Sequence, residues 1–415
     1  MAPDRTALIV GAGIGGLAAA VAVKRAGWNV RVFERAASPR ELGFALLLAP
    51  NAMHALGALG LADIARRGGA VATGGEMRRP DGTVLRRFDT AAARALMDED
   101  AVCILRPVLH GALLDAVGLD SIELSAEAAR FAHTSDGVEL TLASGTTVRG
   151  NILIGADGVG SIVRRQLHPS EPPPRPSGLV AIRGVARDVV HLLGDSSGAQ
   201  YFGRGIEAGV ARAGEREVYW YMSLRAAEAG NLREPAGAVA GRVASQFHEP
   251  FQGIVRATPP NDMRLDELFE RDPMERWGSG PMTLLGDAAH PMLPHAGQGA
   301  AQALEDAVAL GAVLGSTANP PDIDAALRRY ERMRAPRTRT VVALARRNAR
   351  MGSIDSAAGC WLRDQVIRFV PQSVILKSLV DLGRPPSTTE EPRTQRSGAT
   401  KHTKVTKEKN TKIPL

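Results

Sequence analysis

The 415-residue sequence contains few cysteine, lysine and aromatic residues. Its two cysteines, Cys103 and Cys360, are too few for the disulfide framework of a small secreted domain. No apolar run approaches the ~20 residues that a membrane-spanning helix needs, and no basic, apolar leader precedes the first motif. The 44 Gly and 26 Pro follow no fixed period, which excludes repeat and collagen-like architectures. We therefore expect a soluble, cytoplasmic protein with no membrane partner.

Lysine is nearly absent before residue 384, where only Lys24 and Lys377 occur. The segment 384–415 carries eight Lys and Arg against three Asp and Glu, so it holds five of the seven net positive charges. We expect this Lys/Thr-rich tail to be disordered, because it has few apolar side chains to bury. The rest of the chain is close to neutral, which gives no support for a nucleic-acid partner.

The length and the pattern of elements predict two folded domains. One domain is indicated by short apolar strands that end in glycine turns and lead into helices, a Rossmann-like α/β pattern. It is discontinuous and comprises 1–72, 101–176 and 276–347. The inserted residues, 73–100 and 177–275, read as longer extended runs and predict a mostly antiparallel sheet. A helical segment is expected at 348–383.

The first motif is Gly11-Ala12-Gly13-Ile14-Gly15-Gly16, between an apolar strand and an Ala-rich helix. Glycines at this spacing allow a tight turn and a close approach of the backbone to a pyrophosphate, which the helix N-terminus attracts. Glu34 ends the next strand, about 20 residues on, where its carboxylate can accept both ribose hydroxyls of an adenosine. An acid at this position favours FAD or NAD over NADP.

Two later turns also follow buried strands. They are Gly155-Ala156-Asp157-Gly158 and Gly286-Asp287-Ala288-Ala289-His290. Ligands of an open parallel sheet collect at the carboxyl ends of its strands, so both turns should face the same crevice as the first glycine loop. The second turn continues through Pro294 and Gly297 into another helix N-terminus, which can support an electron-rich carbonyl edge.

These three motifs, in this order, resemble those of the class A flavoprotein aromatic hydroxylases, the para-hydroxybenzoate hydroxylase-like FAD monooxygenases. The resemblance covers roughly residues 5–350 and matches their GxGxxG, DG (Asp157-Gly158) and GD (Gly286-Asp287) motifs. It implies an α/β FAD-binding domain with an inserted substrate-binding sheet and C-terminal helices. It also implies noncovalent FAD, with NADH or NADPH as a transient co-substrate, since no second GxGxxG is present. The implied reaction hydroxylates an aromatic or heteroaromatic small molecule through a C4a-hydroperoxyflavin formed with O2.

The resemblance also implies which residues hold the cofactor. Glu34 and Arg35 would lie at the adenosine, Arg106 at the phosphates and ribityl chain, Asp157 near both nucleotides, and Asp287 at the ribityl hydroxyls or pyrophosphate. The full set is Gly11, Gly13, Gly15, Gly16, Glu34, Arg35, Gly43, Arg106, Asp157, Gly158, Gly286, Asp287, Pro294, Gly297, Gln298, Gly299 and Ala300. One departure is Ala301, where the family often has Asn. No metal is implied, because no His, Cys and carboxylate cluster has ligand spacing.

The sequence signals for the residues of the substrate pocket are less specific than those for the cofactor site. The candidates are Arg183, Tyr201, Glu207, Tyr219, Tyr221 and His295. Strand alternation places Tyr219 and Tyr221 on one face and Trp220 on the other, without saying which face lines the pocket. Related urate hydroxylases carry an arginine near the position of Glu207, which disfavours a urate-type anion here. No catalytic base is assigned.

Other interpretations of the function remain open. The same fold supports epoxidation or dehydrogenation, whereas halogenation would need a Trp-x-Trp-x-Ile-Pro motif that the four tryptophans do not form. A rival from another class is a non-catalytic binding protein built on this fold, as the Rab GDP-dissociation inhibitors are. The choice between NADH and NADPH, and between monomer and homodimer, is not indicated.

Overall fold

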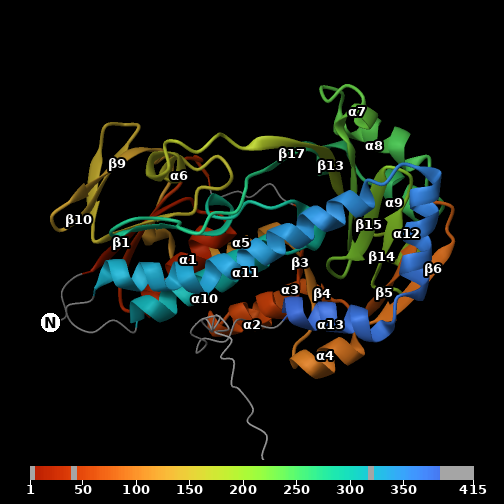
Figure 1. Cartoon of the computed structure of the whole chain (residues 1–415), viewed down its shortest axis with the longest axis horizontal. Coiled ribbons are helices and arrows are strands. Elements are labelled where there is room, and N and C mark those ends of the chain that lie inside the picture. Colours follow the sequence, from red (N-terminus) through yellow and green to blue (C-terminus); the bar gives the residue numbers. More distant parts are fainter. Residues whose placement is uncertain (1–4, 39–43, 316–321, 384–415) are drawn as a thin grey trace, which may run out of the picture.

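The computed structural model of the chain describes residues 5–38, 44–315 and 322–383. Two large sheets lie toward opposite ends of the molecule, and the helix α11 (Ile323–Gly352) runs along its length (Figure 1). α11 joins the two ends by packing, because its Ala345 and Ala349 share an apolar cluster with Ala181 of the second sheet and Leu293 of the first domain.

The first sheet has five strands in the order β18-β12-β1-β2-β8, and every neighbouring pair is parallel. The strands are β1 (Thr6–Val10), β2 (Asn29–Phe33), β8 (Ile122–Glu123), β12 (Ile152–Gly155) and β18 (Met282–Leu284). Their apolar runs are continuous because the central strands are buried on both faces. Leu8, Ile9, Leu153 and Ile154 are each fully buried.

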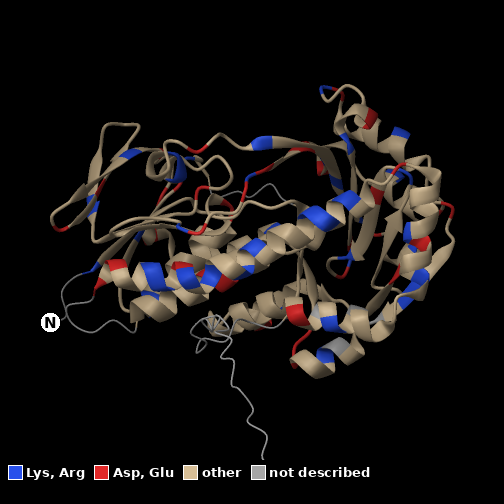
Figure 2. Ribbon diagram, viewed as in Figure 1, with Lys and Arg blue, Asp and Glu red and all other residues tan. Residues whose placement is uncertain are grey.

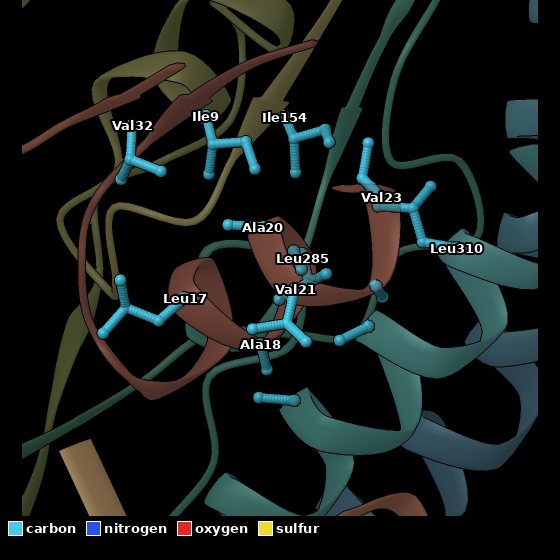
Figure 3. Packing of buried hydrophobic residues seen from close by; sticks show 14 of the residues in the cluster. Ile9, Leu17, Ala18, Ala20, Val21, Val23, Val32, Ile154, Leu285 and Leu310 are labelled. Atoms are coloured by element: carbon cyan, nitrogen blue, oxygen red, sulfur yellow. The ribbon is translucent and has the colours of Figure 1, made fainter. Parts of the chain in front are cut away.

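Helices cover this sheet. α1 (Ile14–Arg25) lies against α10 (Gly299–Gly315), and Figure 3 shows Ala18 and Val21 of α1 close to α10 and Ala20 turned toward Ile9 and Ile154 of the sheet. The contact is close because Gly311 lacks a side chain: an added Cβ would lie 2.9 Å from the Cβ of Ala22. The N-terminal end of α1, which carries the glycine motif, is thus held in place by the packing of the helix against α10 and the sheet.

The second sheet has seven strands in the order β17-β13-β16-β15-β14-β5-β6. Its strands are β5 (Gly74–Arg78), β6 (Val84–Asp89), β13 (Arg175–Arg187), β14 (Gly198–Phe202), β15 (Ile206–Arg212), β16 (Glu217–Arg225) and β17 (Met263–Glu270). All neighbours are antiparallel except β14 and β5. The expected fold class, an α/β domain with an inserted, mostly antiparallel sheet, is confirmed.

Helices within the inserted segment escaped the sequence analysis, which interpreted that stretch as extended. They are α7 (Ala226–Ala229), α8 (Ala236–Ala244) and α9 (Phe251–Arg256). α8 and α9 cover one face of the seven-stranded sheet, where Val239, Phe251 and Ile254 share a cluster with Trp220. The other face of this sheet is turned toward the first domain.

The remaining elements frame these two bodies. Two three-stranded sheets are formed by β3 (Ala45–Leu48), β4 (Gly69–Val71) and β7 (Val102–Leu105), and by β9 (Ala128–Thr134), β10 (Gly137–Leu142) and β11 (Thr147–Gly150). The helices are α2 (Pro50–Ala58), α3 (Ala62–Gly68), α4 (Ala91–Met97), α5 (Arg106–Val117), α6 (Ile162–Leu167), α12 (Ala357–Phe369) and α13 (Gln372–Gly383). Within the described part of the chain, no helix is both long and apolar enough to cross a membrane.

Candidate active site

The glycine loop between β1 and α1 is held close to the turn that follows β12. Gly11 has φ +101°, and a Cβ added there would lie 2.5 Å from the carbonyl oxygen of Ala156. A Cβ on Gly15 would lie 2.9 Å from Leu285, at the end of β18, and one on Gly16 would overlap the Gly11 carbonyl. Gly13 is the N-cap of α1. These glycines therefore bring the three sequence motifs together at the carboxyl edge of the first sheet.

Glu34 lies beside the glycine loop, at the end of β2. Its Oε2 accepts a hydrogen bond from the Ala12 N–H at 2.8 Å, and its Oε1 accepts one from the Ala36 N–H at 2.9 Å. The carboxylate is half-buried, whereas the neighbouring Arg35 is exposed. Glu34 is thus already oriented by the backbone of the loop that would cradle a pyrophosphate. Gly43 lies outside the described residues.

Asp287 follows β18 in the short turn η4 (Gly286–Ala288), where Gly286 has φ +61°. Its side chain reaches solvent, yet enough protein surrounds the carboxyl for burial to raise its pKa, while His290 and Arg106 act in the opposite direction. Arg106, the first residue of α5, is close enough to this turn for its charge to act on the Asp287 carboxyl.

A buried polar network, which the sequence analysis did not find, holds the Asp287 turn from below. Asp306 of α10 accepts from the Gly286 N–H at 3.0 Å, pairs with His290 Nε2 at 2.6 Å, and accepts from Arg334 Nε at 2.6 Å. Burial alone would raise the pKa of Asp306, but the charges of His290 and Arg334 hold it at about 2. Arg334 also pairs with Glu305.

The loop after this turn contains η5 (Pro294–Ala296) and ends where α10 begins at Gly299. Pro294 and Gly297 are exposed, and Gly297 has φ +61°. The Gln298 side chain points into the buried network, where it accepts a hydrogen bond from Asn51 at 3.0 Å, and its carbonyl accepts one from the Gln302 N–H at 2.8 Å. Ala300 lies in the first turn of α10, and Ala301, the departure from the family pattern, is a core residue.

Asp157 is used within the protein to start α6. Its Oδ1 accepts from the Ser161 hydroxyl at 2.5 Å, and its Oδ2 accepts from the N–H groups of Ile162 and Val163 at 2.7 and 3.3 Å. Burial raises the pKa of this carboxyl against those hydrogen bonds. Gly158 follows with φ +77°. The DG motif therefore shapes the turn beside the glycine loop, and a direct contact of Asp157 with a nucleotide stays a prediction.

Tyr219 and Tyr221 of β16 lie on the face of the seven-stranded sheet that is turned toward the first domain. Their rings are stacked, with centroids 6.1 Å apart. Gly209 on β15 makes room for Tyr221, because an added Cβ would lie 2.5 Å from its ring. Trp220 points to the opposite face, where it is fully buried and donates from Nε1 to Thr258 at 2.8 Å. The alternation expected from the sequence is present, and the tyrosines are on the inner face.

This inner face is joined to the loop of the first domain by hydrogen bonds. His295 Nε2 lies 2.9 Å from Ser223 Oγ of β16, and the His295 carbonyl accepts from Asn348 of α11 at 3.0 Å. Burial lowers the pKa of His295 to about 4, so its ring is neutral at physiological pH. The tyrosines and the loop at 294–299 are therefore held in a fixed relation by three elements.

Two charged candidates lie on the same face. Glu207 is 3% exposed and accepts from Tyr221 Oη at 3.1 Å and from Gln200 Nε2 at 2.9 Å. Burial raises the pKa of Glu207 to about 7. Arg183 of β13 donates to Asp266 at 3.2 Å. The polar groups here thus form hydrogen-bonded pairs, and the side chains of Tyr219 and Tyr221 are partly exposed.

The expectation for Tyr201 has to be corrected. Its side chain is 1% exposed and packs edge-on against Phe247 and Phe251, at centroid distances of 5.8 and 5.2 Å. Tyr201 is therefore a core residue under α9, on the opposite face from Tyr219 and Tyr221. Strand β14 places Gln200, one residue earlier, on the inner face instead.

The residues present fit a dinucleotide cofactor. Gly11, Gly13, Gly15 and Gly16 leave a backbone cradle at the N-terminus of α1, Glu34 is oriented beside it, and Asp287 and Arg106 lie at the neighbouring turn. A Cβ on Gly11 would collide with the turn after β12, one on Gly15 would approach Leu285 just after β18, and one on Gly16 would overlap the Gly11 carbonyl. Among the residues that the structure describes, no group of three or more His, Cys, Asp or Glu could hold a metal ion.

Comparison with known proteins agrees with this arrangement. A family model described as FAD binding domain matches residues 4–345, and the chain belongs to that family. It is a FAD-dependent flavoprotein monooxygenase of the class A aromatic hydroxylase type, with FAD as its cofactor.

Relatives of known activity extend over most of the chain. Aurachin C monooxygenase/isomerase of Stigmatella aurantiaca is 35% identical and covers 88% of this chain and 94% of its own. 3-Hydroxybenzoate 6-hydroxylase 1 of Aquipseudomonas alcaligenes is 33% identical, with 80% and 86% covered. The crystal structure of Klebsiella pneumoniae HpxO with FAD and uric acid has a TM-score of 0.84 at 28% identity, with 91% and 96% covered.

Proposed function

We propose that the protein uses NADH or NADPH and dioxygen to hydroxylate an aromatic or heteroaromatic small molecule held against the inner face of the seven-stranded sheet. The reaction would take place in the cytoplasm, with the protein as a monomer or homodimer. When bound, FAD supplies a hydride acceptor and activates dioxygen. The chain itself supplies the binding, the orientation and the exclusion of water.

Separate groups of residues would bind the cofactor and the substrate. Glu34, Arg106 and Asp287 would hold FAD at the carboxyl edge of the first sheet, with the glycine loop at its pyrophosphate. Tyr219 and Tyr221 would hold the substrate ring, since stacked aromatic faces bind flat ring systems. Their position matters because an error of about 1 Å in a reacting pair can cost on the order of 100-fold in rate.

Glu207 would act on the substrate through Tyr221. The Tyr221 hydroxyl donates to the Glu207 carboxylate, which leaves the phenolic oxygen free to accept a hydrogen bond from a substrate O–H or N–H. A carboxyl whose pKa is about 7 can take up or release a proton at physiological pH. This favours a ring that carries a hydroxyl or ring N–H, and it disfavours a urate-type anion beside a buried acid.

The observation that carries the proposal is the link between the two domains. The hydrogen bond of His295 to Ser223 sets the loop at 294–299 against the strand that bears both tyrosines. A substrate on those rings would lie beside the loop that, by resemblance, borders the flavin ring. Water would be kept from the reacting atoms by the same packing.

The experiment is a screen of aromatic and heteroaromatic compounds with the FAD-loaded protein. We expect at least one hydroxy- or N–H-bearing ring to stimulate NADH or NADPH oxidation and to give a product that carries one oxygen atom from labelled dioxygen. Stimulated oxidation without labelled product would identify an effector rather than a substrate. A protein that binds FAD but consumes neither nicotinamide with any ring would contradict the proposal and favour a binding role.

A second candidate is oxygen insertion into a ring double bond, that is, epoxidation. It is favoured by the relative whose name joins monooxygenase to isomerase, because a rearrangement can follow such an insertion. The two products differ in the ultraviolet spectrum, since hydroxylation keeps the aromatic ring and epoxidation interrupts it.

A further inference from the structure

Leu47 is an exposed apolar side chain on the strand β3, whose neighbouring side chains face the core. In the pairing of β3 with β7, Leu47 lies directly opposite Cys103. The next pair, Leu46 and Ile104, packs into the core of the first domain. Because strand side chains alternate, Leu47 and Cys103 share the other face of this three-stranded sheet. Cys103 is 3% exposed and Leu47 is 49% exposed, so the protein covers one half of that face and leaves the other half open.

This face is turned toward the inner face of the seven-stranded sheet. Burial raises the pKa of the Tyr219 hydroxyl, Arg183 acts against this rise, and the Cys103 thiol is close enough to add to it. The two sheets are also joined along the chain, since β4 leads directly into β5. At that junction the Ser197 hydroxyl accepts from the Gly74 N–H at 3.1 Å. The open half of the three-stranded sheet therefore looks toward the stacked tyrosines.

The loop that precedes α10 is fixed to both β3 and β16. Helix α2 starts just after β3, and its Asn51 donates to the Gln298 side chain of this loop at 3.0 Å. At the other end of the loop, His295 is hydrogen-bonded to Ser223 of β16. Leu47 and the stacked tyrosines are therefore held beside the same loop, which is the one next to the substrate position proposed above.

The side chains around this region favour an uncharged ligand. None of the described strands β3, β4 and β7 contains a charged residue, whereas α11 carries many (Figure 2). Glu207 is hydrogen-bonded within the inner face, and Arg183 donates to Asp266 there. A ligand between the two faces would therefore meet Leu47 on one side and the partly exposed tyrosines on the other.

We propose that Leu47 contacts the substrate and selects a ring that carries an uncharged, apolar substituent. The ring would lie on Tyr219 and Tyr221, with its hydroxyl or N–H at the Tyr221 hydroxyl and its alkyl or fused-ring substituent against Leu47. This inference rests on the reaction proposed above and adds the chemistry of the substituent. Each methylene that leaves water on Leu47 should strengthen binding about fourfold, which corresponds to roughly 0.8 kcal/mol per buried CH2.

A carboxylate substituent is the alternative, and Arg183 is the residue that would bind it. Among the described residues, the buried Nε of Arg183 has no hydrogen-bond partner. Asp266, however, already accepts from the same guanidinium at 3.2 Å. A carboxylate turned toward Leu47 would also lose its water to an apolar side chain, which opposes binding. The two chemistries therefore predict opposite preferences between a neutral and an acidic substituent of the same shape.

The test uses the full FAD-loaded chain without nicotinamide, and binding is followed by the change that a phenol causes in the flavin absorbance spectrum. From para-methylphenol to para-ethylphenol to para-propylphenol, affinity should rise about fourfold per methylene. A second pair, para-isobutylphenol and para-hydroxyphenylacetate, has one shape with and without a charge, and the isobutyl compound should bind more tightly. Equal or tighter binding of para-hydroxyphenylacetate, or no binding by any of these phenols, would overturn the proposal.

The matched variants are Leu47→Ala and Leu96→Ala, which truncates a leucine of α4 that is 53% exposed. Leu47→Ala should flatten the rise of affinity with chain length and keep the affinity for FAD, whereas Leu96→Ala should behave as the wild type. An unchanged rise in Leu47→Ala would contradict the proposal. So would a loss of FAD affinity alone, because Leu47 would then contact the cofactor. A rise with chain length but no oxygenated product would instead refute the proposed reaction and leave the apolar contact of Leu47 standing.

Discussion

Substitution of Asp306 by Asn tests whether the buried network supports the turn at Gly286–Ala288 and, through it, the binding of FAD. Asp306 is fully buried and serves three partners: the Gly286 N–H, His290 and Arg334. Removing one member of a buried ion pair costs roughly 3–5 kcal/mol, because its partner stays buried without compensation. Asn keeps the shape and one acceptor oxygen, and Arg334 keeps Glu305, so we expect about 3 kcal/mol. FAD should bind more weakly, because the single acceptor oxygen of Asn cannot serve both the Gly286 N–H and Arg334, as the two carboxylate oxygens do.

The assay is denaturant unfolding of the FAD-free protein together with FAD titration by flavin fluorescence. Asp364→Asn is the matched control, because Asp364 is equally buried and ion-paired but belongs to α12. It should lose stability and keep its FAD affinity. An Asp306→Asn protein with unchanged unfolding midpoint and unchanged FAD affinity would refute the reasoning.

The loss of stability caused by Asp306→Asn should also become smaller as pH falls. The pKa of Asp306 is about 2 in the folded protein, below its ordinary value of 3.8. A carboxyl with a lowered folded pKa contributes stability above its unfolded pKa and loses that contribution as pH falls through the folded one. The stability difference between wild type and Asp306→Asn should therefore narrow between pH 4 and pH 2.

Three further outcomes are expected. Glu34→Ala and Asp287→Ala should each weaken FAD by about 10- to 150-fold in the same titration, since a charge-assisted hydrogen bond contributes roughly 1.5–3 kcal/mol; unchanged affinity would remove both residues from the site. Burial lowers the pKa of His295 from 6.5 to about 4, so the stability that its neutral ring contributes is present above pH 6.5 and is lost as pH falls toward 4. His295→Gln should flatten that part of the stability profile. Product formation should change near pH 7 through the carboxyl of Glu207, and Glu207→Gln should remove that inflection.

The arrangement of the glycine loop and Glu34 could be predicted because its signals are local. Gly11 and Gly16 must lack side chains, because backbone atoms lie close to them, from a residue a few positions away or from the end of a neighbouring strand. Glu34 directly follows the next strand and accepts a hydrogen bond from the loop. Such requirements leave a short pattern in the sequence. Strand alternation likewise separated Tyr219 and Tyr221 from Trp220, since it depends only on the two-residue period.

The features that the sequence did not predict depend on contacts between distant segments of the chain. Asp306, Arg334 and His290 lie on three elements, and nothing near any of them indicates that they meet. Tyr201 was misplaced because alternation does not say which face is covered, and the covering helix α9 is a six-residue element in a stretch that reads as extended. The packing of α12 could not be foreseen either, because its buried side holds Arg363 and Asp364, the opposite of the usual pattern.

The central claim is that the substrate lies on the face of β16 that carries Tyr219 and Tyr221. It is tested most directly by the ratio of oxygenated product to NAD(P)H consumed, with hydrogen peroxide measured in parallel. Tyr221→Ala should keep FAD and nicotinamide oxidation while the ratio falls and peroxide rises, because a misplaced ring does not receive the oxygen. Trp220→Ala should lose stability and leave the ratio of the folded fraction unchanged. The opposite result, an unchanged ratio for both Tyr219→Ala and Tyr221→Ala with a lowered ratio for Trp220→Ala, would contradict the account.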